Sequence, residues 1–470
     1  MSLHLFNTYS RALEEFRPMG PDGRKVSMYT CGPTVYSHAH IGNFRAYVFE
    51  DLLQRHLEFR GYEVERVMNI TDVDDKTIRG SLAAGIPLSE FTAPFKRAFF
   101  EDLETLRIKP AGAYPEATDG GHIRAMIAMI ATLMSRGLAY QAEDKSVYFR
   151  INKFPEYGRL AHFDLSELRS SGRIKSDEYD KEHVGDFALW KAWDEADGSV
   201  RWESPWGPGR PGWHIECSAM STQLLGDQID IHCGGVDNIF PHHEAEIAQT
   251  EGCTGRKFVR YWLHCAHLQV EGQKMSKSLG NFHTLRDLLA RGYSGREIRY
   301  ALLRVHYRAP LNFTWEGMEE ARQALARIDG WPERLREAVQ SAPQETGSSP
   351  ESGGEGFADA LDDDLNISAA LGFFFETIRE TNRLLDQESI GRETAAAWLA
   401  WWQKIDTVLA LTSSGDEVPA GVLQMAEERS EARLAKDWRK SDELRDQIAA
   451  LGWEMRDGKD GQKLTKRGGL

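Results

Sequence analysis

VSMYTCGPTVYSHAHIGNFRAYVFEDLLQRHLEFRGYEVERVMNITD, residues 26–72, contains the pattern that decides the fold. Residues 26–30 alternate and are rich in strand-forming side chains, and a Gly-Pro pair ends that run. From residue 41 to about residue 61, apolar residues recur at three- and four-residue spacing and a glycine closes the segment, which predicts a helix. Residues 63–72 have the pattern of a second strand. Strand, turn, helix and strand in this order predict the opening of a doubly wound α/β domain.

The rest of the chain continues this pattern after one interruption. From about residue 114 to residue 203 the rhythm is lost, which predicts an inserted domain with a helix over 121–137. The α/β pattern resumes with DQIDIHCGG (227–235) and KFVRYWLHCAHL (257–268). Beyond residue 280 the pattern is helical. It is broken by a linker rich in Ser, Gly, Pro and Glu at 341–356 and by a shorter boundary at 412–420.

Length and composition narrow the class of protein. A chain of 470 residues is too long for one compact core and predicts two to four domains. With 41% hydrophobic and 27% charged residues, no apolar run near 18 residues and no signal-peptide pattern, we expect a cytoplasmic protein. The five cysteines are an odd number spread over a long chain, so we expect buried thiols or metal ligands and no disulfide framework.

The formal charge of −15 argues against nonspecific nucleic-acid binding, because that binding gains from neutralised phosphates. The charge is unevenly distributed. Residues 427–470 carry 11 Lys or Arg and 10 Asp or Glu, so this tail is nearly neutral on an otherwise acidic chain. Such a tail is compatible with an RNA partner and does not demonstrate one.

KMSKS, residues 274–278, is the clearest late motif. Lys274 and Lys277 flank a serine on a glycine-bounded loop, where mobile ammonium groups can reach a polyphosphate. The alternative is a polar surface turn, since a five-residue match also arises by chance.

Two further segments have the composition of a nucleotide site. His38, His40, Gly42 and Asn43 stand where the first helix begins, and a helix N-terminus binds phosphate. A capped core histidine is the alternative for each histidine taken singly. The loop GGVDN follows a predicted strand, and its Asp237 can accept hydrogen bonds from ribose hydroxyls. An ordinary turn explains that loop equally well.

In this order, these motifs resemble those of the class I aminoacyl-tRNA synthetases, whose HIGH and KMSKS motifs bracket ATP. More narrowly, the chain resembles the cysteinyl-tRNA synthetase family over essentially its whole length. The segments that carry the narrower resemblance are YTCGPTVYSHAHIGN, NITDVDDK, DFALWK, GWHIECSAM, DIHCGGVDNIFPHHEAEIAQ, KMSKSLGN and ARLAKDWRKSDELRDQIAALG.

The resemblance implies one zinc ion in the amino-acid pocket, with Cys31, Cys217, His242 and Glu246 as ligands. From the residues alone, His242 and Glu246 are four apart in a helix-like run and can chelate one ion, and two thiolates suit tetrahedral Zn²⁺. Residues alone leave other candidates open, namely Cys233, His214, His232 and His243. In the implied site, a cysteine substrate delivers its thiolate to zinc, and a serine hydroxyl is a poor ligand there. The substrate-cysteine residues that the resemblance implies are Cys31, Thr71, Trp213, Cys217 and His242; for Trp213 an ordinary core aromatic is the alternative.

The resemblance implies a reaction in two steps. Cysteine and ATP, accompanied by Mg²⁺, form cysteinyl-adenylate and pyrophosphate, and a ribose hydroxyl of tRNA(Cys) then attacks the activated carbonyl. His40 and Asn43 hold the phosphates, and Lys274 and Lys277 stabilise the leaving pyrophosphate. No side chain stands out as a general base. The expected ATP-binding residues are Gly32, His38, His40, Gly42, Asn43, Gly234, Gly235, Asp237 and Lys277.

The chain departs from the family pattern at two places. Asn43 occupies the position of the second histidine of HIGH; it keeps a hydrogen-bond donor and cannot become cationic. Near the C-terminus, Leu464 stands where the family has a tryptophan that would stack on a base.

The implied organisation has six parts. They are the first half of a Rossmann catalytic domain (1–113), an inserted connective domain (114–203), the second half of the catalytic domain (204–280), a stem-contact region (281–319), a helical anticodon-binding bundle (320–411) and a small anticodon-recognition module (421–470). We expect a monomer. Two alternatives stay open: a cysteine ligase of mycothiol synthesis, which transfers cysteine to an amino sugar, and a zinc- or RNA-binding paralogue without catalysis.

Overall fold

The computed structural model describes residues 2–163, 185–276, 279–343 and 353–413, and shorter pieces between 425 and 466. The chain divides into two compact units. The first contains residues 1–282, 302–314 and 348–381, and the second contains residues 283–301, 315–347 and 382–470.

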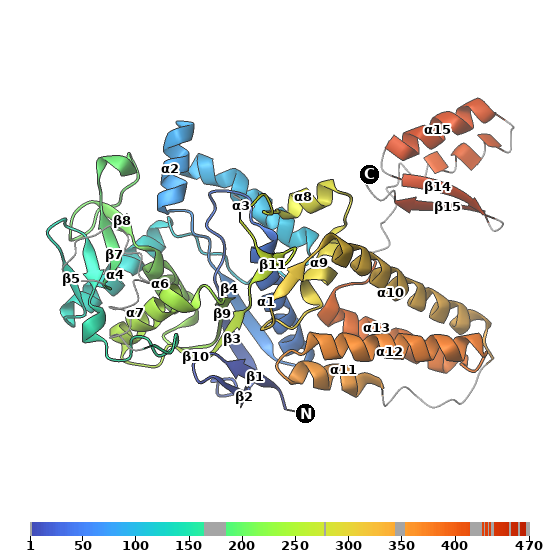
Figure 1. Ribbon diagram of the computed structural model, residues 1–470, viewed down its shortest axis with the longest axis horizontal. Coiled ribbons are helices and arrows are strands. Elements are labelled where there is room, and N and C mark those ends of the chain that lie inside the picture. Colours follow the sequence, from blue (N-terminus) through green and yellow to red (C-terminus); the bar gives the residue numbers. More distant parts are fainter. Residues whose placement is uncertain are drawn as a thin grey trace. The chain divides into compact units, whose positions relative to one another are not determined.

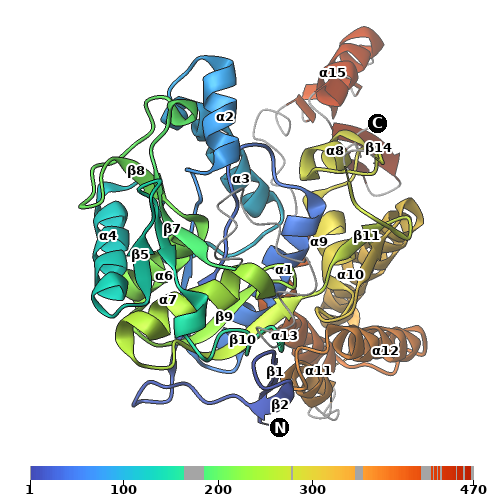
Figure 2. The ribbon, with the colours of Figure 1, turned by 60° about the vertical axis from the view of Figure 1, so that its left-hand side comes forward.

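The first unit is built on a four-stranded parallel sheet with the strand order β10-β9-β3-β4. Its strands are β3 (Lys25–Thr30), β4 (Glu63–Met68), β9 (Ile229–Gly235) and β10 (Val259–Cys265). Helix α1 (Ile41–Phe59) connects β3 to β4, and α7 (Glu244–Thr254) connects β9 to β10. Because the two connections run in opposite directions from the centre, the strand order reverses between β3 and β9. Figures 1 and 2 show α1 on one side of the strands and α7, with α6 (Trp213–Leu225), on the other.

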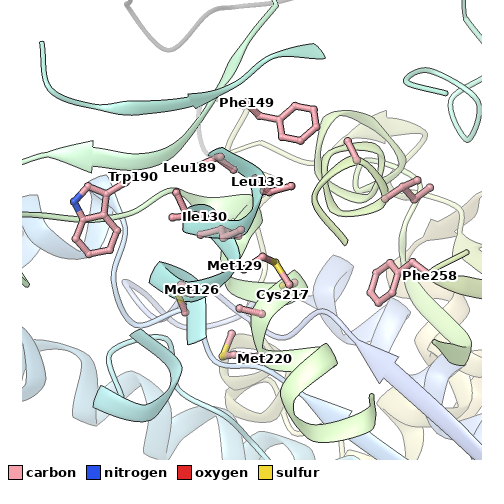
Figure 3. Packing of buried hydrophobic residues seen from close by; sticks show 14 of the residues in the cluster. Met126, Met129, Ile130, Leu133, Phe149, Leu189, Trp190, Cys217, Met220 and Phe258 are labelled. Atoms are coloured by element: carbon pink, nitrogen blue, oxygen red, sulfur yellow. The ribbon is translucent and has the colours of Figure 1, made fainter. Parts of the chain in front are cut away.

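A second sheet is inserted between β4 and β9, and its order is β5-β6-β7-β8 with antiparallel neighbours. Its strands are β5 (Ala139–Gln141), β6 (Val147–Phe149), β7 (Phe187–Ala192) and β8 (Gly209–Pro211). The helices before it are α2 (Asp75–Ala84), α3 (Leu88–Thr105) and α4 (Gly120–Ser135). Figure 3 shows side chains of α4, α6 and β7 packed in one apolar cluster, with Cys217 between Met129 and Met220.

The first unit also contains a hairpin, a small three-stranded sheet and two helical segments. Strands β1 (His4–Asn7) and β2 (Ala12–Glu15) form an antiparallel hairpin. Strands β11 (Leu268–Val270), β12 (Gln273–Lys274) and β13 (Leu311–Phe313) form a small sheet with β11 in the centre. The unit also holds α11 (Gly353–Asp362) and the first part of α12 (Ile367–Asp386).

The second unit is mostly helical. Its helices are α8 (Leu285–Ala290), α9 (Gly295–Leu303, up to residue 301), α10 (Trp315–Ser341), α13 (Arg392–Leu409) and α15 (Trp438–Ala450), with the end of α12. Trp331 of α10 packs its ring against Trp398, Trp401 and Trp402 of α13. Strands β14 (Trp453–Gly458) and β15 (Gly461–Lys466) form a hairpin after α15.

The expected fold class is confirmed, and so are the strands and helices around the first motif. Two expectations were wrong. The linker expected over 341–356 ends earlier, because α11 begins at Gly353 and buries Phe357 and Leu361. The chain after residue 280 is also not purely helical, since β13 pairs with β11. Among the described helices, none has the length and apolarity that a bilayer crossing requires.

Candidate active site and metal centre

The predicted site residues gather where the strand order reverses. Cys31 follows β3 directly, Gly234 and Gly235 end β9, and α1 begins at Ile41. In an open parallel sheet, ligands bind outside the carboxyl ends of the strands at this point. Backbone hydrogen bonds join the loop after β3 to the segment after β4, from Val35 N to Thr71 O at 3.1 Å and from Thr71 N to Pro33 O at 3.1 Å.

The structure brings the four predicted metal ligands together. The ligand atoms of Cys31, Cys217, His242 and Glu246 all lie within 4.8 Å of one another, and Cys217, His242 and Glu246 are at most 1% exposed. His242 is the last residue but one of a π-helical turn (Ile239–His243), and Glu246 stands in the first turn of α7. A second set of four shares two of these residues and consists of Cys31, His232, His243 and Glu246.

Further histidines hold these side chains in place. His214 Nδ1 lies 2.9 Å from His242 Nδ1, which leaves Nε2 of His242 toward Glu246. His232 Nε2 lies 3.0 Å from Glu246 Oε2, and His243 Nε2 lies 3.3 Å from Cys31 Sγ. Such partners fix the orientation of metal ligands and tune their basicity.

The chemistry of the cluster fits a soft divalent cation. Glu246 Oε1 is buried, accepts no hydrogen bond, and lies 3.2 Å from His242 Nε2, so two ligand atoms stand side by side without bonding each other. The hydrogen bond with Cys217 and burial raise the pKa of Cys31 well above its usual value, and burial raises the pKa of Cys217. Burial lowers the pKa of His242. A bound cation offsets the free-energy cost of burying charged thiolates. It also binds imidazole in its neutral form, which is the form that acts as a metal ligand.

The walls of the predicted amino-acid pocket lie beside this cluster. The Trp213 ring stacks on the His242 ring with centroids 4.2 Å apart, and 43% of Trp213 is exposed, so it is not an ordinary core aromatic. Thr71 is buried and donates from Oγ1 to Glu216 Oε2 at 2.9 Å. Asn69 Nδ2 donates to Thr71 Oγ1 at 3.2 Å.

The predicted phosphate residues form the N-terminal cap of α1. Asn43 N donates to His40 Nδ1 at 3.2 Å, and His40 N donates to Asn43 Oδ1 at 3.1 Å, which completes a capping box. Asn43 therefore has a structural role that histidine at this position would not reproduce in the same way. His38 lies outside this box and packs edge-on against Phe95.

The loop that carries KMSKS reaches the start of α1. A Cβ added to Gly42 would lie 3.2 Å from the Met275 methyl group and 3.0 Å from the His40 ring. Asn281 brackets the loop, because its Oδ1 accepts from Ser276 N at 2.8 Å and its Nδ2 donates to Lys274 O at 3.2 Å. Lys274 is exposed at the end of β12. Lys277 lies outside the described residues.

The remaining predicted nucleotide residues lie in the segments that follow β3 and end β9. Gly32 has no room for a side chain, because a Cβ there would lie 1.7 Å from the Asn69 carbonyl oxygen. Gly32 N donates to Asn69 Oδ1 at 2.9 Å. Gly234 and Gly235 end β9, and Asp237 is exposed in the turn that follows.

Three residues beside the site were not expected from the sequence: Glu216, which accepts from Thr71, Tyr29, whose ring packs edge-on against His232, and His264, a neighbour of His243. Glu216 stands beside the predicted ligand Cys217, and Tyr29 stands two residues before Cys31. His264 lies 2.8 Å from His243, Nε2 to Nδ1, and follows Trp262 by two residues on β10. The two-residue period of a strand would have placed His264 and Trp262 on one face.

Comparison with known families assigns three segments. Residues 18–323 match "tRNA synthetases class I (C) catalytic domain", residues 356–412 match "DALR domain", and residues 415–463 match "Cysteinyl-tRNA ligase anticodon binding domain".

Curated relatives are similar over the whole chain. The cysteine–tRNA ligase of Chlamydia muridarum (strain MoPn / Nigg) is 52% identical over 479 residues, covering 99% of this chain and 100% of the relative. That of Protochlamydia amoebophila (strain UWE25) is 49% identical over 473 residues, covering 99% and 98%.

Among solved structures, the similarity shows the fold alone. A Mycobacterium tuberculosis methionyl-tRNA synthetase with methionyl-adenylate has a TM-score of 0.62 at 17% identity, covering 82% of this chain and 89% of that one. A putative arginyl-tRNA synthetase from Campylobacter jejuni has a TM-score of 0.56 at 12% identity, covering 83% and 92%.

Proposed function

The chain belongs to the cysteine–tRNA ligase family of class I tRNA synthetases, and from this premise we propose that it ligates L-cysteine to tRNA(Cys) with ATP through a cysteinyl-adenylate. One observation supports this proposal most directly. A buried set of two thiols, an imidazole and a carboxylate lies at the reversal point of the sheet, on the same side as the capped start of α1. This arrangement supports an amino-acid site and a phosphate site at the carboxyl ends of neighbouring strands, as one condensation requires.

For selection of cysteine, we assign one zinc ion to Cys31, Cys217, His242 and Glu246. Zinc bound there supplies a Lewis-acid position that a thiolate occupies well and a hydroxyl poorly. Trp213, stacked on His242, covers the pocket from the exposed side, and Thr71 forms part of its wall. A bond that only the correct substrate makes gives discrimination on the order of 10⁴ without an editing site.

For activation, we assign the α1 cap to the ATP phosphates and KMSKS to the leaving pyrophosphate. His40 and Asn43 present the helix N-terminus to ATP, which Mg²⁺ accompanies. Lys274, exposed at the end of β12, and Lys277 are assigned to the pyrophosphate. Gly42 permits close approach, and Asp237, exposed in the turn after β9, is assigned to a ribose hydroxyl. Alignment and charge stabilisation carry the step, so no general base is needed.

For the second half of the reaction, the proposal assigns tRNA binding to the parts that follow the catalytic domain. The family match at 415–463 supports the module predicted over 421–470, and the match at 356–412 supports the helical bundle predicted over 320–411. The six domain boundaries, a monomeric state and a cytoplasmic location remain parts of this proposal.

The first experiment measures ATP-dependent attachment of labelled cysteine to tRNA with a GCA anticodon. Serine replaces cysteine in one control, and an amino-sugar acceptor replaces tRNA in another. We expect charging of tRNA by cysteine alone. Transfer to the amino sugar only would refute the tRNA assignment and keep the adenylation assignment. No adenylate at all would favour a paralogue without catalysis.

The zinc assignment has its own test. We expect Cys217→Ala to lose bound zinc and cysteine activation together, because a buried carboxylate and imidazole then face an incomplete set. Cys253→Ala is the matched control, since Cys253 lies in no set of clustered ligands among the described residues and is partly exposed. Metal analysis after gel filtration measures the number of zinc ions bound per chain. One zinc per chain in Cys217→Ala would remove Cys217 from the site.

A further inference from the structure

The end of α11 and the turn that follows it, together called the α11–α12 turn, contain two buried aspartates in an acidic run. Residues 361–366 read LDDDLN, and Asp362 and Asp364 are 1% and 3% exposed, whereas Asp363 between them is exposed. Buried carboxylates of this kind are retained where partners satisfy them. Asp364 and Leu365 also have φ values of +56° and +53°. Non-glycine residues take this conformation when the surrounding contacts determine it.

Asp362 bonds to the C-terminal end of α1. Its Oδ1 accepts from Arg60 Nε at 2.8 Å and lies 2.9 Å from His56 Nε2, and Arg60 Nη2 bonds its other oxygen. The planar guanidinium therefore holds the carboxylate with two parallel bonds. His56 is fully buried and stands in the last turn of α1, and Arg60 is the C-cap residue.

Asp364 bonds to a second set of partners in the same unit. Tyr307 Oη donates to its Oδ1 at 2.6 Å, and Arg308 Nε donates to its Oδ2 at 2.6 Å. The Phe6 N–H donates to Oδ1 at 2.8 Å, and His306 Nε2 lies 3.6 Å from Oδ2. The Tyr307 ring stacks on Phe49 in the middle of α1, with centroids 4.3 Å apart.

Both aspartates are thus connected to α1, the helix whose other end bears His40 and Asn43. Nineteen residues span about 28 Å at the helical rise. Helix α1 has further partners, and its packing on the strands of the parallel sheet does not involve the turn. Arg45 is buried and donates to the carbonyl oxygens of Leu302, Val305 and His306, and α1 packs on β9 and β10.

We infer that Asp362 and Asp364 are positioning residues that fix α11 and the start of α12 to α1, so that tRNA can engage the helical segment and the adenylate site together. This inference rests on the proposed function. These helices lie in the segment that matches the DALR domain, to which the proposed function assigns part of the tRNA binding. Because α1 packs on β9 and β10 without the turn, loss of either carboxylate leaves cysteine activation in place and weakens productive use of tRNA.

The experiment uses the full zinc-loaded chain with Asp362→Asn, Asp364→Asn and, as matched control from the same turn, Asp363→Asn. Two rates are measured: cysteine-dependent exchange of pyrophosphate into ATP, and aminoacylation over a range of tRNA concentrations. We expect exchange within about twofold of the wild type in all three. For Asp362→Asn and Asp364→Asn we expect kcat/KM for tRNA to fall at least tenfold, mainly through KM, and for Asp363→Asn no change.

Arg60→Lys is a milder variant in case an asparagine variant does not fold. It keeps the positive charge and loses the two parallel hydrogen bonds that hold Asp362. It should therefore also leave exchange unchanged and lower kcat/KM for tRNA, by a smaller factor than the asparagine variants. Equal loss of exchange and aminoacylation in Arg60→Lys, or unchanged tRNA kinetics in every variant, would overturn the inference. A wild-type protein without cysteine-dependent exchange would instead refute the proposed function, and the inference with it.

Discussion

Asn43 shows how one side chain can serve both a helix and a substrate. Its Oδ1 caps the His40 N–H, while its position at the helix start faces the proposed phosphate site. A family pattern of two histidines would not have suggested the reciprocal cap. The structural contribution and the ATP contribution of Asn43 can be separated by two substitutions.

We expect Asn43→Ala to destabilise the protein by about 1 kcal/mol, because the cap loses its acceptor. Asn43→Asp keeps an acceptor in the first turn, where a carboxylate also favours the helix dipole, so stability should be retained. Its charge repels phosphate, so its KM for ATP should rise at least tenfold. Denaturant unfolding and ATP–pyrophosphate exchange measure the two effects. An unchanged KM in Asn43→Asp would show that residue 43 does not face the phosphates.

Glu50 is a buried carboxyl that the proposed reaction does not use. It is fully buried in α1, and neither oxygen meets the geometry of a hydrogen bond with another described residue, since the nearby Thr30 hydroxyl donates to Val67 O. Burial raises its pKa from 4.5 to about 8, against the opposing effects of Arg66 and Thr30. The folded state therefore holds a proton on Glu50 that the unfolded state has lost between pH 4.5 and pH 8. Stability from this group is present in full below pH 4.5 and is lost as the pH rises through about 8.

We expect Glu50→Gln to become more stable relative to the wild type as the pH rises from 5 to 9, by at most about 5 kcal/mol. Urea unfolding at several pH values measures the difference. Glu63→Gln, at the exposed start of β4, is the control, and its free energy of unfolding should change with pH as that of the wild type does. If the free energies of unfolding of Glu50→Gln and the wild type changed in parallel with pH, the raised pKa of Glu50 would be contradicted.

Much of the candidate site could be predicted at this scale, but not the choice among its ligands. The i, i+4 spacing of His242 and Glu246 places both on one helix face. The residues that join them come from the end of β3 and from α6, and only folding brings those together. His232 and His243 are also residues that can bind a metal ion, and they lie in an overlapping set of four. Spacing alone could therefore not separate them from Cys217 and His242.

At the scale of elements, the contact between α1 and the KMSKS loop connects the two halves of the proposed ATP site. Gly42 is the residue that makes this contact possible, since its Cα faces both His40 and Met275. We expect Gly42→Ala to lower kcat/KM for cysteine-dependent exchange at least tenfold, because the added methyl group displaces the loop from the start of α1. Steady-state exchange kinetics measure the loss.

Gly330→Ala is the matched control for that substitution. Gly330 lies within α10 with no atom within 4 Å of an added Cβ, so alanine there should stabilise the helix by about 0.5–1 kcal/mol and leave exchange unchanged. If Gly42→Ala retained wild-type kinetics, the loop would not need close contact with the helix start.

Elements with strong periodicity were predicted well, and elements made by pairing were not. The helix expected over 41–61 is α1 (Ile41–Phe59), and the strands at 227–235 and 257–268 contain β9 and β10. β13 has three residues and exists because β11 lies parallel to it, a partner 43 residues away that no local pattern reveals. The start of α11 was hidden by glycines that composition assigned to a linker.

At the scale of the whole molecule, activation and RNA recognition are assigned to different parts of the chain. Trp438 opens α15 within the segment that matches the anticodon-binding family, and 59% of it is exposed beside Arg439 and Lys440. An exposed aromatic ring next to cations is suited to stack on an unpaired base. This residue is a better candidate for that contact than Leu464, which lies on β15.

We expect Trp438→Ala to raise KM for tRNA about tenfold and to leave cysteine-dependent exchange unchanged, because stacking on one base contributes about 1–3 kcal/mol. Leu13→Ala, which truncates another exposed apolar residue in the first unit, should change neither rate. Aminoacylation at varied tRNA concentration measures the effect. A fall in exchange for Trp438→Ala would mean that the module also acts on activation.

Helix α1 also limits which mutations the protein tolerates. The helix is bonded to the cap residues at one end and to Asp362 at the other, and each inserted residue would turn its far end by about 100° and move it by about 1.5 Å. Substitutions can be absorbed by repacking, but a change of length cannot. Among related chains we therefore expect substitutions between positions 41 and 60, and no insertions or deletions there.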